Sequence, residues 1–397
     1  MRATFLPFSP PLIGEEEINE VVDTLRSDWI TTGPKVKRFE QEFAAYVGAP
    51  AALGLSSCTA ALHTSLAALG VGAGDCVVTT PMTFVSSVHA VEHTGATPVL
   101  ADVEPDTLNI DPRRVAEAID AARARGLRVR ALLPVHLYGH PCDMGALVDL
   151  AREYHLAVVE DAAHALPASF DGRRVGSFAD RYGVPVLSCF SFYATKNLTT
   201  AEGGMLTGPA ELIDEARVWS LHGMSRDAWN RYGEKGSWFY EVVRPGFKYN
   251  LTDIQAALGL HQLRKLDAFQ SRRREIVRRY SEAFAPLEEL TLPAERAGAG
   301  HAWHLYVVRL NLERLRLTRD EFIEEMRARR VGTSVHFIPV HTHPYYRERY
   351  GFKPEDFPAA MSAFRRIVSL PLNPRMSDAD ADDVIEAVGD IVEKFRR

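Results

Sequence analysis

The stretch VVEDAAHALPASFDGRRVGSFADRYGVPVLSCFSFYATKNLTTAEGGMLT, residues 158–207, decides the fold of this chain. It contains apolar runs of the kind that form strands in a sheet buried on both faces. Asp161 comes at the end of one run, and Lys196 comes just after another. In an open α/β sheet, the residues that follow parallel strands meet in a crevice at the carboxyl ends of those strands. The stretch therefore predicts an α/β sheet with an acid and an amine in its crevice.

Outward from this stretch, the first two-thirds of the chain alternates short apolar runs with helical patterns. Residues 14–29 and 36–47 space their apolar side chains at helical period. The apolar runs are mostly continuous, as in strands that are covered on both faces. We expect strands at residues 51–57, 76–81, 97–103, 131–139, 156–162, 185–192 and 204–208. This order predicts a doubly wound, mainly parallel sheet of the α/β class.

The pattern changes after about Leu251. Residues 252–284 predict one long helix with Thr252 as its N-cap, and a loose segment rich in proline, glycine and alanine follows. We then expect strands at residues 304–311, 331–337 and 367–372, and helices at residues 319–330 and 377–395. These predict a large domain over residues 1–259 and a small α+β domain over residues 260–397. The N-terminal segment is a candidate to pack on the small domain.

Composition and charge exclude several classes of protein. The chain has 397 residues, of which 46% are hydrophobic, and its acidic and basic residues are mixed along it with a net charge of −6. Without a basic block, neither nucleic acid nor an anionic membrane surface is expected as a partner. No apolar run is long enough to span a membrane or to form a signal peptide. The four cysteines are scattered, as free thiols are in a reducing compartment. We expect a cytoplasmic protein.

Asp161 and Lys196 are the two groups that pyridoxal phosphate chemistry requires. A lysine amine forms a Schiff base with the cofactor aldehyde, and an acid keeps the pyridine nitrogen protonated so that the ring accepts electrons. An unpaired acid at the end of a central strand would be costly, and a pyridinium would satisfy it. Lys196 is followed by TTAEGGM, whose small residues let the backbone pass close to a ligand.

Other residues at the predicted strand ends fit the same cofactor. Ser57, Cys58 and Thr59 join a strand to the start of a helix, where main-chain N–H groups bind anions. Ser191 offers a second hydroxyl for a phosphate. The ordinary alternative for Ser57 is a helix cap, and for Ser191 a strand residue with no ligand.

Two ring-bearing residues are further candidates. Phe84, at another junction between a strand and a helix, is placed to stack on a flat ring. His164, three residues after Asp161, is placed to hydrogen-bond the phenolic oxygen of the cofactor. Taken singly, such a phenylalanine is more often a core residue, and such a histidine more often structural.

No metal is expected. The acidic segment SDADADD, residues 377–383, fits a helix start with Ser377 as the cap better than a calcium loop. His336, His341 and His343 lack the spacing of a zinc site. No glycine-rich dinucleotide motif follows a strand, which disfavours nicotinamide and flavin cofactors.

A set of motifs in this order is similar to the DegT/DnrJ/StrS family of sugar aminotransferases. They are SSCTAALH, TFVSS, VVEDAAHA, SFYATKN, GFKYNLTDIQAALG and HAWHLY. The resemblance runs nearly from end to end of the chain. It implies the fold of aspartate aminotransferase, called fold type I, with pyridoxal 5'-phosphate as the cofactor. It also implies a homodimer with each active site at the subunit interface.

The resemblance assigns a role to each candidate. It implies that Lys196 carries the cofactor as a Schiff base and that Asp161 binds the pyridine nitrogen. It implies that Phe84 stacks on the ring and that His164, where many relatives have glutamine, donates a hydrogen bond. The residues that it implies around the phosphate are Ser57, Cys58, Thr59 and Ser191.

The partner subunit is implied to complete the phosphate site. Many relatives use an asparagine of a GxNxR-like motif for this contact. Here Lys248 stands at the place of that asparagine and Asn250 at the place of the arginine. The resemblance leaves open which of the two reaches the phosphate.

The implied reaction moves an amino group from glutamate, which leaves as 2-oxoglutarate, to the keto carbon of a nucleotide-diphosphate sugar. The segments FLPFSPP, WITTGPK and HTHPYYRERY most resemble members that aminate a UDP-linked 4-keto-pentose to UDP-4-amino-4-deoxy-L-arabinose, used in lipopolysaccharide biosynthesis. The alternative acceptor is another nucleotide-linked 4-keto-6-deoxyhexose.

Three other functions suit the same fold. Relatives that dehydrate the sugar replace the lysine, so Lys196 argues against them. A non-catalytic regulator that binds a nucleotide sugar would not need the pair Lys196 and Asp161. An amino-acid aminotransferase needs an arginine for the substrate carboxylate, and neither Arg365 nor Arg375 lies in a context typical of that role.

Overall fold

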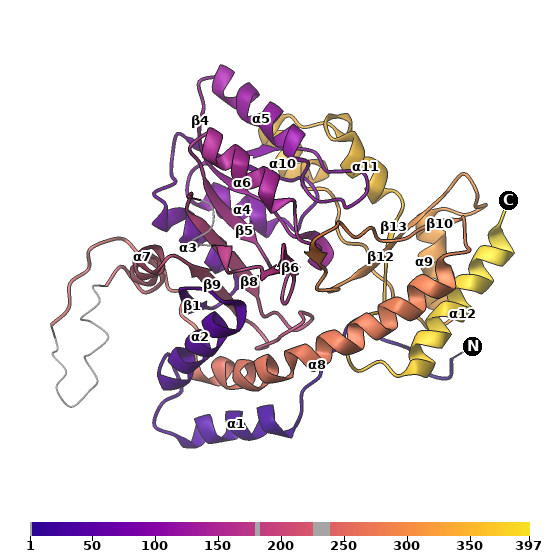
Figure 1. The fold of residues 1–397 in the computed structure, drawn as a ribbon, viewed down its shortest axis with the longest axis horizontal. Helices are drawn as coiled ribbons and strands as arrows, with labels where there is room; N and C mark the ends of the chain where they lie inside the picture. Colours follow the sequence, from indigo (N-terminus) through magenta and orange to yellow (C-terminus); the bar gives the residue numbers. More distant parts are fainter. Residues whose placement is uncertain (1, 179–182, 225–238) are drawn as a thin grey trace.

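The computed structural model describes residues 2–178, 183–224 and 239–397 (Figure 1). Its main feature is a seven-stranded sheet in the order β1-β9-β8-β5-β4-β2-β3. The strands are β1 Ala51–Leu55, β2 Asp75–Thr79, β3 Thr97–Leu100, β4 Arg128–Leu133, β5 Ala157–Asp161, β8 Val186–Ser191 and β9 Gly204–Gly208. Helices cover both faces of this sheet. The predicted α/β class is therefore confirmed.

Strand direction places the predicted site residues along one edge of the sheet. Strands β2, β3, β4, β5 and β8 are parallel, while β9 is antiparallel to both β8 and β1. Strand β1 therefore runs in the same direction as β8. As a result, β1, β2, β5 and β8 all end at the same edge.

The helices form two layers. On one face, α3 Cys58–Ala68, α4 Ser86–His93 and α7 Ala210–Ser220 pack on the sheet. On the other face lie α2 Pro34–Val47, α5 Pro112–Ala124, α6 Met144–Glu153 and the first half of α8 Asp253–Phe284. Helix α1 Glu15–Arg26 lies outside α8 (Figure 1). The sheet is thus buried on both sides, which explains its continuous apolar strands.

Two helix caps follow the predictions, and Ser57 takes the cap role that was its ordinary alternative. The Ser57 hydroxyl accepts a hydrogen bond from the N–H of Ala60 at the start of α3. Thr252 and Ser377 each begin a capping box, at α8 and α12 respectively. Residues 377–383 therefore form a helix start, as their sequence predicts.

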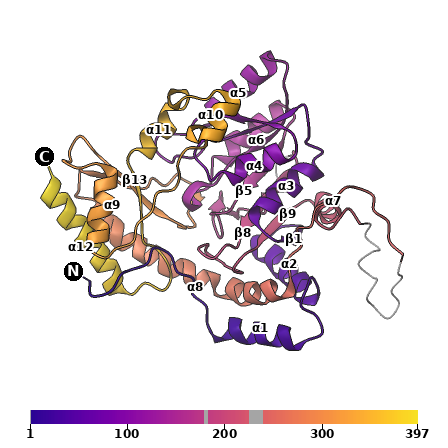
Figure 2. The same ribbon diagram turned by 180° about the vertical axis from the view of Figure 1, so that it is seen from behind.

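Helix α8 joins the large sheet to a second core (Figure 2). That core surrounds a smaller antiparallel sheet in the order β10-β12-β13. Its elements are β10 Leu290–Thr291, β12 Tyr306–Leu310, α9 Arg319–Ala328, β13 Ile367–Leu370 and α12 Asp378–Phe395. Leu6 of the N-terminal segment is buried in the same core. The domain boundary expected at residue 260 falls inside α8, and it stays a prediction.

The remaining short elements lie mostly between the two cores. Helices α10 Pro344–Tyr350 and α11 Pro358–Phe364 pack beside the large sheet (Figure 1). A third sheet joins β11 Ala299–Gly300 to β6 Ser169–Phe170 and β7 Arg173–Arg174. In the described ranges, no helix is both long and apolar enough to cross a membrane.

The strand expected at residues 331–337 is wrong. Only single bridges form there, between Leu6 and Val331 and between Ser334 and Ser369. The N-terminal segment supplies the hydrogen-bond partners on one side, since Leu6 bonds the main chain of Arg330 and Gly332. Two different neighbours along seven residues prevent a continuous ladder.

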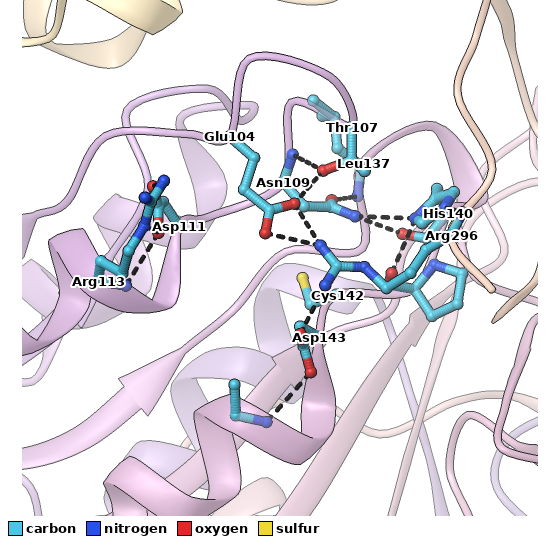
Figure 3. A network of polar contacts seen from close by, with 12 residues as sticks. Glu104, Thr107, Asn109, Asp111, Arg113, Leu137, His140, Cys142, Asp143 and Arg296 are labelled. Carbon is cyan, nitrogen blue, oxygen red and sulfur yellow. Dashed lines mark hydrogen bonds and ion pairs between the residues drawn. The ribbon is translucent and has the colours of Figure 1, made fainter. Parts of the chain in front are cut away.

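A polar cluster around Arg296 fastens the loop before β11 to the large sheet (Figure 3). The Arg296 guanidinium contacts Glu104 at 2.5 Å and Asp143 at 2.5 Å. Its main-chain N–H donates to Nε2 of His140 over 2.9 Å. Asn109 in turn donates to the main-chain oxygen of His140. The bonds of Arg296 tie residues more than 150 positions apart in the sequence.

Candidate active site

The edge where β1, β2, β5 and β8 end gathers the predicted residues. Ser57 follows β1, Phe84 follows β2, Asp161 ends β5, and Ser191 ends β8. Lys196 lies in the loop between β8 and β9. The fold therefore brings together side chains that are up to 139 positions apart, from Ser57 to Lys196.

Asp161 is held by hydrogen bonds on both carboxylate oxygens. The hydroxyl of Ser87 donates to Oδ2 over 2.7 Å, and the N–H of Ala163 donates to Oδ1 over 3.1 Å. The residue is only 4% exposed. Burial raises the pKa of Asp161, while Ser87, Ala163 and the charge of Lys196 oppose that rise. The carboxylate is thus fixed in direction, and its charge is only partly compensated.

Lys196 presents a desolvated amine near this carboxylate. Burial lowers its pKa to about 8, against opposing effects from Cys58 and Asp161. Both Lys196 and Asp161 are described residues, and they form no ion pair with each other. An amine with this pKa is partly neutral near neutral pH, as a nucleophile must be. The pair therefore interacts across a gap instead of neutralising itself by contact.

The start of α3 lies at the same sheet edge, and its first N–H groups are directed outward from the helix. The main-chain N–H groups of Cys58 and Thr59 have no acceptor within the described residues, because they lie in the first turn of the helix. The Ser57 hydroxyl already serves as the cap. Gly204 of β9 lies against this turn, where a Cβ would come within 2.5 Å of the Ser57 carbonyl carbon. Only glycine permits so close an approach.

His164 is a hydrogen-bond donor by its surroundings. Its Nδ1 accepts from the main-chain N–H of Tyr138 over 3.2 Å. Burial moves the pKa of His164 well below its ordinary value, so the ring is neutral. A neutral ring whose Nδ1 accepts carries its proton on Nε2. That leaves the Nε2–H as the group available to a ligand.

Phe84 lies at the open side of the site. It is 58% exposed, although it is a large aromatic residue next to a buried sheet edge. Its ring centroid is 5.9 Å from that of Phe337, which stacks at 5.7 Å on His164. The expected alternative of a core phenylalanine is therefore wrong, because most of the ring is left uncovered.

The last three predicted residues lie at the rim. The Ser191 hydroxyl accepts from the N–H of Tyr193 over 3.4 Å. Lys248 donates to the Asn250 side chain, and Asn250 donates to Thr32 over 2.7 Å. Asn250 also pairs with Leu55 at the end of β1. Lys248 and Asn250 thus sit together, close to the turn that begins α3.

Two features near Asp161 were not predicted from the sequence: the contact with Ser87 and the buried pair of Glu160 and His136. Ser87 is fully buried and bonds the carboxylate, although it stands in the quoted motif TFVSS. Glu160 and His136 form a buried pair at 3.2 Å next to Asp161 in the sequence and sheet. Because side chains alternate along β5, Glu160 points to the sheet face opposite Asp161. This alternation is the feature of the sequence that distinguishes the positions of the two carboxylates. Among the described residues, no group of three metal-binding side chains is found.

These residues fit pyridoxal phosphate. The amine of Lys196 is desolvated, the charge of the Asp161 carboxylate is only partly compensated, and two N–H groups of α3 have no acceptor within the described residues. The cofactor offers an aldehyde, a basic ring nitrogen and a phosphate, one for each of these features. The uncovered ring of Phe84 suits its flat heterocycle.

Comparison with known proteins gives one consistent result. Residues 11–389 match the DegT/DnrJ/EryC1/StrS aminotransferase family. The chain is 52% identical over 393 residues to the spore coat polysaccharide biosynthesis protein SpsC of Bacillus subtilis, with 98% of each chain covered.

Solved structures agree with this match over nearly the whole chain. Spr1654 of Streptococcus pneumoniae, described as a candidate sugar aminotransferase, superposes in its PLP form with a TM-score of 0.89 and 36% identity, covering 98% of this chain and 99% of that one. It has also been solved in a PMP form. S. venezuelae DesV superposes with a TM-score of 0.85 and 35% identity, covering 97% and 98%.

Proposed function

Since the chain belongs to the DegT/DnrJ/EryC1/StrS aminotransferase family and is a PLP-dependent sugar aminotransferase, we propose that it moves an amino group from glutamate to the 4-keto carbon of a nucleotide-linked sugar. One observation carries this proposal. The desolvated amine of Lys196 and the buried carboxylate of Asp161 interact without touching, at the edge where parallel strands end. When bound, pyridoxal phosphate supplies an aldehyde for the amino group and a ring that accepts electrons.

Lys196 is proposed as the nucleophile and the proton carrier. Its pKa of about 8 makes Nζ able both to take a proton and to return it near neutral pH. Asp161 is proposed to hold a proton on the ring nitrogen of the cofactor. Its orientation is set from two sides, by Ser87 and Ala163, so that it needs no rearrangement when the ligand arrives.

The other site residues are proposed to bind and orient the cofactor. Its phosphate would lie against the unpaired N–H groups of Cys58 and Thr59, with the hydroxyls of Ser57, Thr59 and Ser191 nearby. The Nε2–H of His164 would donate to the phenolic oxygen. Phe84 would cover one face of the ring, which explains its exposure before the ligand binds.

We propose that the active form is a homodimer. Just before Lys248, a described segment exposes Phe239, Tyr240, Val242 and Val243. An exposed apolar run of this kind marks a protein interface. In a dimer, Lys248 or Asn250 would reach the cofactor phosphate of the partner subunit. Light scattering on the purified protein should give twice the mass of one chain, and a monomer that is fully active would contradict the proposal.

Two acceptor sugars compete. The resemblance of residues 5–11, 29–35 and 341–350 supports a UDP-linked 4-keto-pentose, as in lipopolysaccharide modification. The 52% identity to a protein named for spore coat polysaccharide biosynthesis favours a different polysaccharide sugar, such as a nucleotide-linked 4-keto-6-deoxyhexose. Both are 4-keto sugars on a nucleotide diphosphate, so the cofactor site alone does not separate them.

A screen of acceptors tests the proposal. The purified enzyme is incubated with ¹⁵N-labelled glutamate and a panel of UDP- and dTDP-linked 4-keto sugars, and the amino sugars are identified by mass. We expect labelled nitrogen in one sugar far above the others, with 2-oxoglutarate formed in equal amount. Preference for the UDP-pentose over the dTDP-hexoses would support the first acceptor, and the reverse preference the second. A panel with no labelled sugar would contradict the proposed function.

A further inference from the structure

A chain of two hydroxyl groups ends at the carboxylate of Asp161. The hydroxyl of Ser87 donates to Oδ2 of Asp161 over 2.7 Å. The hydroxyl of Thr83 lies 2.7 Å from that of Ser87. Ser87 is fully buried and Thr83 is 2% exposed, so water does not reach either of them.

Counting the hydroxyl protons shows which group donates in each of these two hydrogen bonds. Ser87 has one hydroxyl proton and three neighbouring oxygens, those of Asp161, Thr83 and the main chain of Phe84, the last at 3.3 Å. A carboxylate is the strongest acceptor of the three, and its bond is short. The Ser87 proton therefore points at Asp161, and Thr83 must donate to Ser87. Each bond polarises the next and strengthens it.

From this geometry we propose that Ser87 is a positioning residue, which holds the Asp161 carboxylate ionised and aimed at the cofactor, with Thr83 as its support. The inference rests on the proposed role of Asp161. Beyond that role, Ser87 would affect the reaction rate through Asp161, without touching the cofactor or the substrate. Ser87 also belongs to the first turn of α4, three residues after Phe84, so one short segment carries both the hydroxyl that bonds the carboxylate and the proposed stacking ring.

The surroundings of Asp161 explain why one hydroxyl matters. Burial opposes the charged form of the carboxylate, and the bond from Ser87 is the strongest influence that favours it. The other groups that act on it are the Ala163 N–H and the charges of Lys196 and His136, while the thiol of Cys58 lies 4.0 Å away. None of these can take the place of Ser87 at Oδ2.

The test compares Ser87→Ala with Ser86→Ala. Ser86 is the neighbouring serine on α4, and its side chain makes no hydrogen bond within the described residues. We expect Ser87→Ala to lower kcat/KM for amination roughly ten- to a hundredfold, mostly in kcat, because a hydrogen bond to a charged group is lost. We also expect the apoenzyme of this variant to bind pyridoxal phosphate about tenfold more weakly, since one hydrogen bond changes affinity on that order. Ser86→Ala should match the wild type in both.

A spectroscopic readout separates this role from a structural one. In Ser87→Ala, Asp161 should be a weaker partner for the ring nitrogen of the cofactor, and this should shift the pH midpoint of the visible absorbance of the holoenzyme. The thermal midpoint of the apoenzyme should stay near that of Ser86→Ala. Thr83→Val keeps the shape of Thr83 without its hydroxyl, and it should cause a smaller change of the same sign, about two- to fivefold in kcat.

The outcomes distinguish the inference from the proposed function. If Asp161→Asn abolishes turnover and Ser87→Ala behaves like Ser86→Ala in absorbance and in kcat, the role of Ser87 is wrong and the proposed function stands. If Asp161→Asn itself retains normal turnover, the proposed role of Asp161 fails, and the inference fails with it.

Discussion

The molecule holds two sets of charged groups that are built in opposite ways. Around Arg296, each charge contacts an opposite one, with Glu104 and Asp143 both at 2.5 Å (Figure 3). At the sheet edge, burial is the largest influence on the pKa values of Asp161 and Lys196, yet these two groups form no ion pair with each other. In the first set each charge contacts an opposite charge, and in the second set the amine and the carboxylate do not contact each other.

The difference is visible in the pKa values. Burial lowers the pKa of Arg296, but its bonds to Glu104 and the charges of Glu104 and Asp143 raise it overall. For Lys196 and Asp161, burial dominates and moves each pKa toward the neutral form. A set of charges that compensates itself stabilises a fold, whereas an uncompensated one is available to a ligand. We therefore expect the Arg296 cluster to be structural and the pair Asp161 and Lys196 to receive a ligand.

The largest expected effect is on Lys196. Replacing it by alanine should lower amination more than a thousandfold and remove the visible absorbance of the bound cofactor, because Lys196 is the amine beside Asp161 that is proposed to hold the cofactor as a Schiff base. The thermal midpoint should change little, since the amine makes no ion pair. Lys353→Ala, at an exposed position, is the control and should remain active. Normal turnover of Lys196→Ala would show that Lys196 does not act in the reaction, and would contradict the difference between the two sets of charges.

Arg296 should show the opposite response, in stability instead of activity. Arg296→Ala breaks two partly buried ion pairs, for a loss of about 2 kcal/mol in the free energy of unfolding. The loss is moderate because Thr107 still donates to Glu104 and Asp143 still caps α6. We expect a lower thermal midpoint and kcat within about threefold of the wild type.

Arg296→Lys is the matched variant for that measurement. The lysine keeps a positive charge but lacks the planar guanidinium that contacts two carboxylates at once. We therefore expect about half of the loss in the free energy of unfolding that Arg296→Ala causes. A large fall in kcat for either variant, without a fall in the thermal midpoint, would mean that the cluster belongs to the active site.

The smallest expected effect is on the pH dependence of the rate at which the apoenzyme binds pyridoxal phosphate. The amine of Lys196 attacks an aldehyde only when it is neutral, and that form increases as the pH rises through its pKa. With a pKa of about 8, the rate at which the apoenzyme captures pyridoxal phosphate should rise with pH to a midpoint near 8. The rate is followed by the growth of visible absorbance between pH 6 and 10. A midpoint near 10.5, the ordinary value for lysine, would show that the amine is solvated after all.

Much of this site could be predicted because its residues are marked by their position along the chain. Asp161 directly ends an apolar run, and Lys196 follows one, so the fold class placed both at one edge. The caps Thr252 and Ser377 were predicted for the same reason, since a cap depends on the few residues after it. The fold class is confirmed by the structure and by the similar proteins, and the enzyme class and the cofactor are confirmed by the similar proteins.

Other features depended on residues far apart in the sequence. The segment 331–337 has strand-like composition, but the N-terminal segment occupies one side of it. Ser87 lies 74 positions from Asp161, and nothing near either residue marks the bond between them. The exposure of Phe84 likewise depends on which segments leave it uncovered.

The sequence by itself determined where strands end, which helices begin with a cap, and which residues of suitable chemistry stand at those points. These depend on short-range periodicity and hydrogen bonding. Only the tertiary structure decided which charges meet a partner, which remain desolvated without one, and which hydroxyl faces the carboxylate. Desolvation and pairing depend on groups from separate segments, and their distances are set only when the sheet and its covering helices pack together.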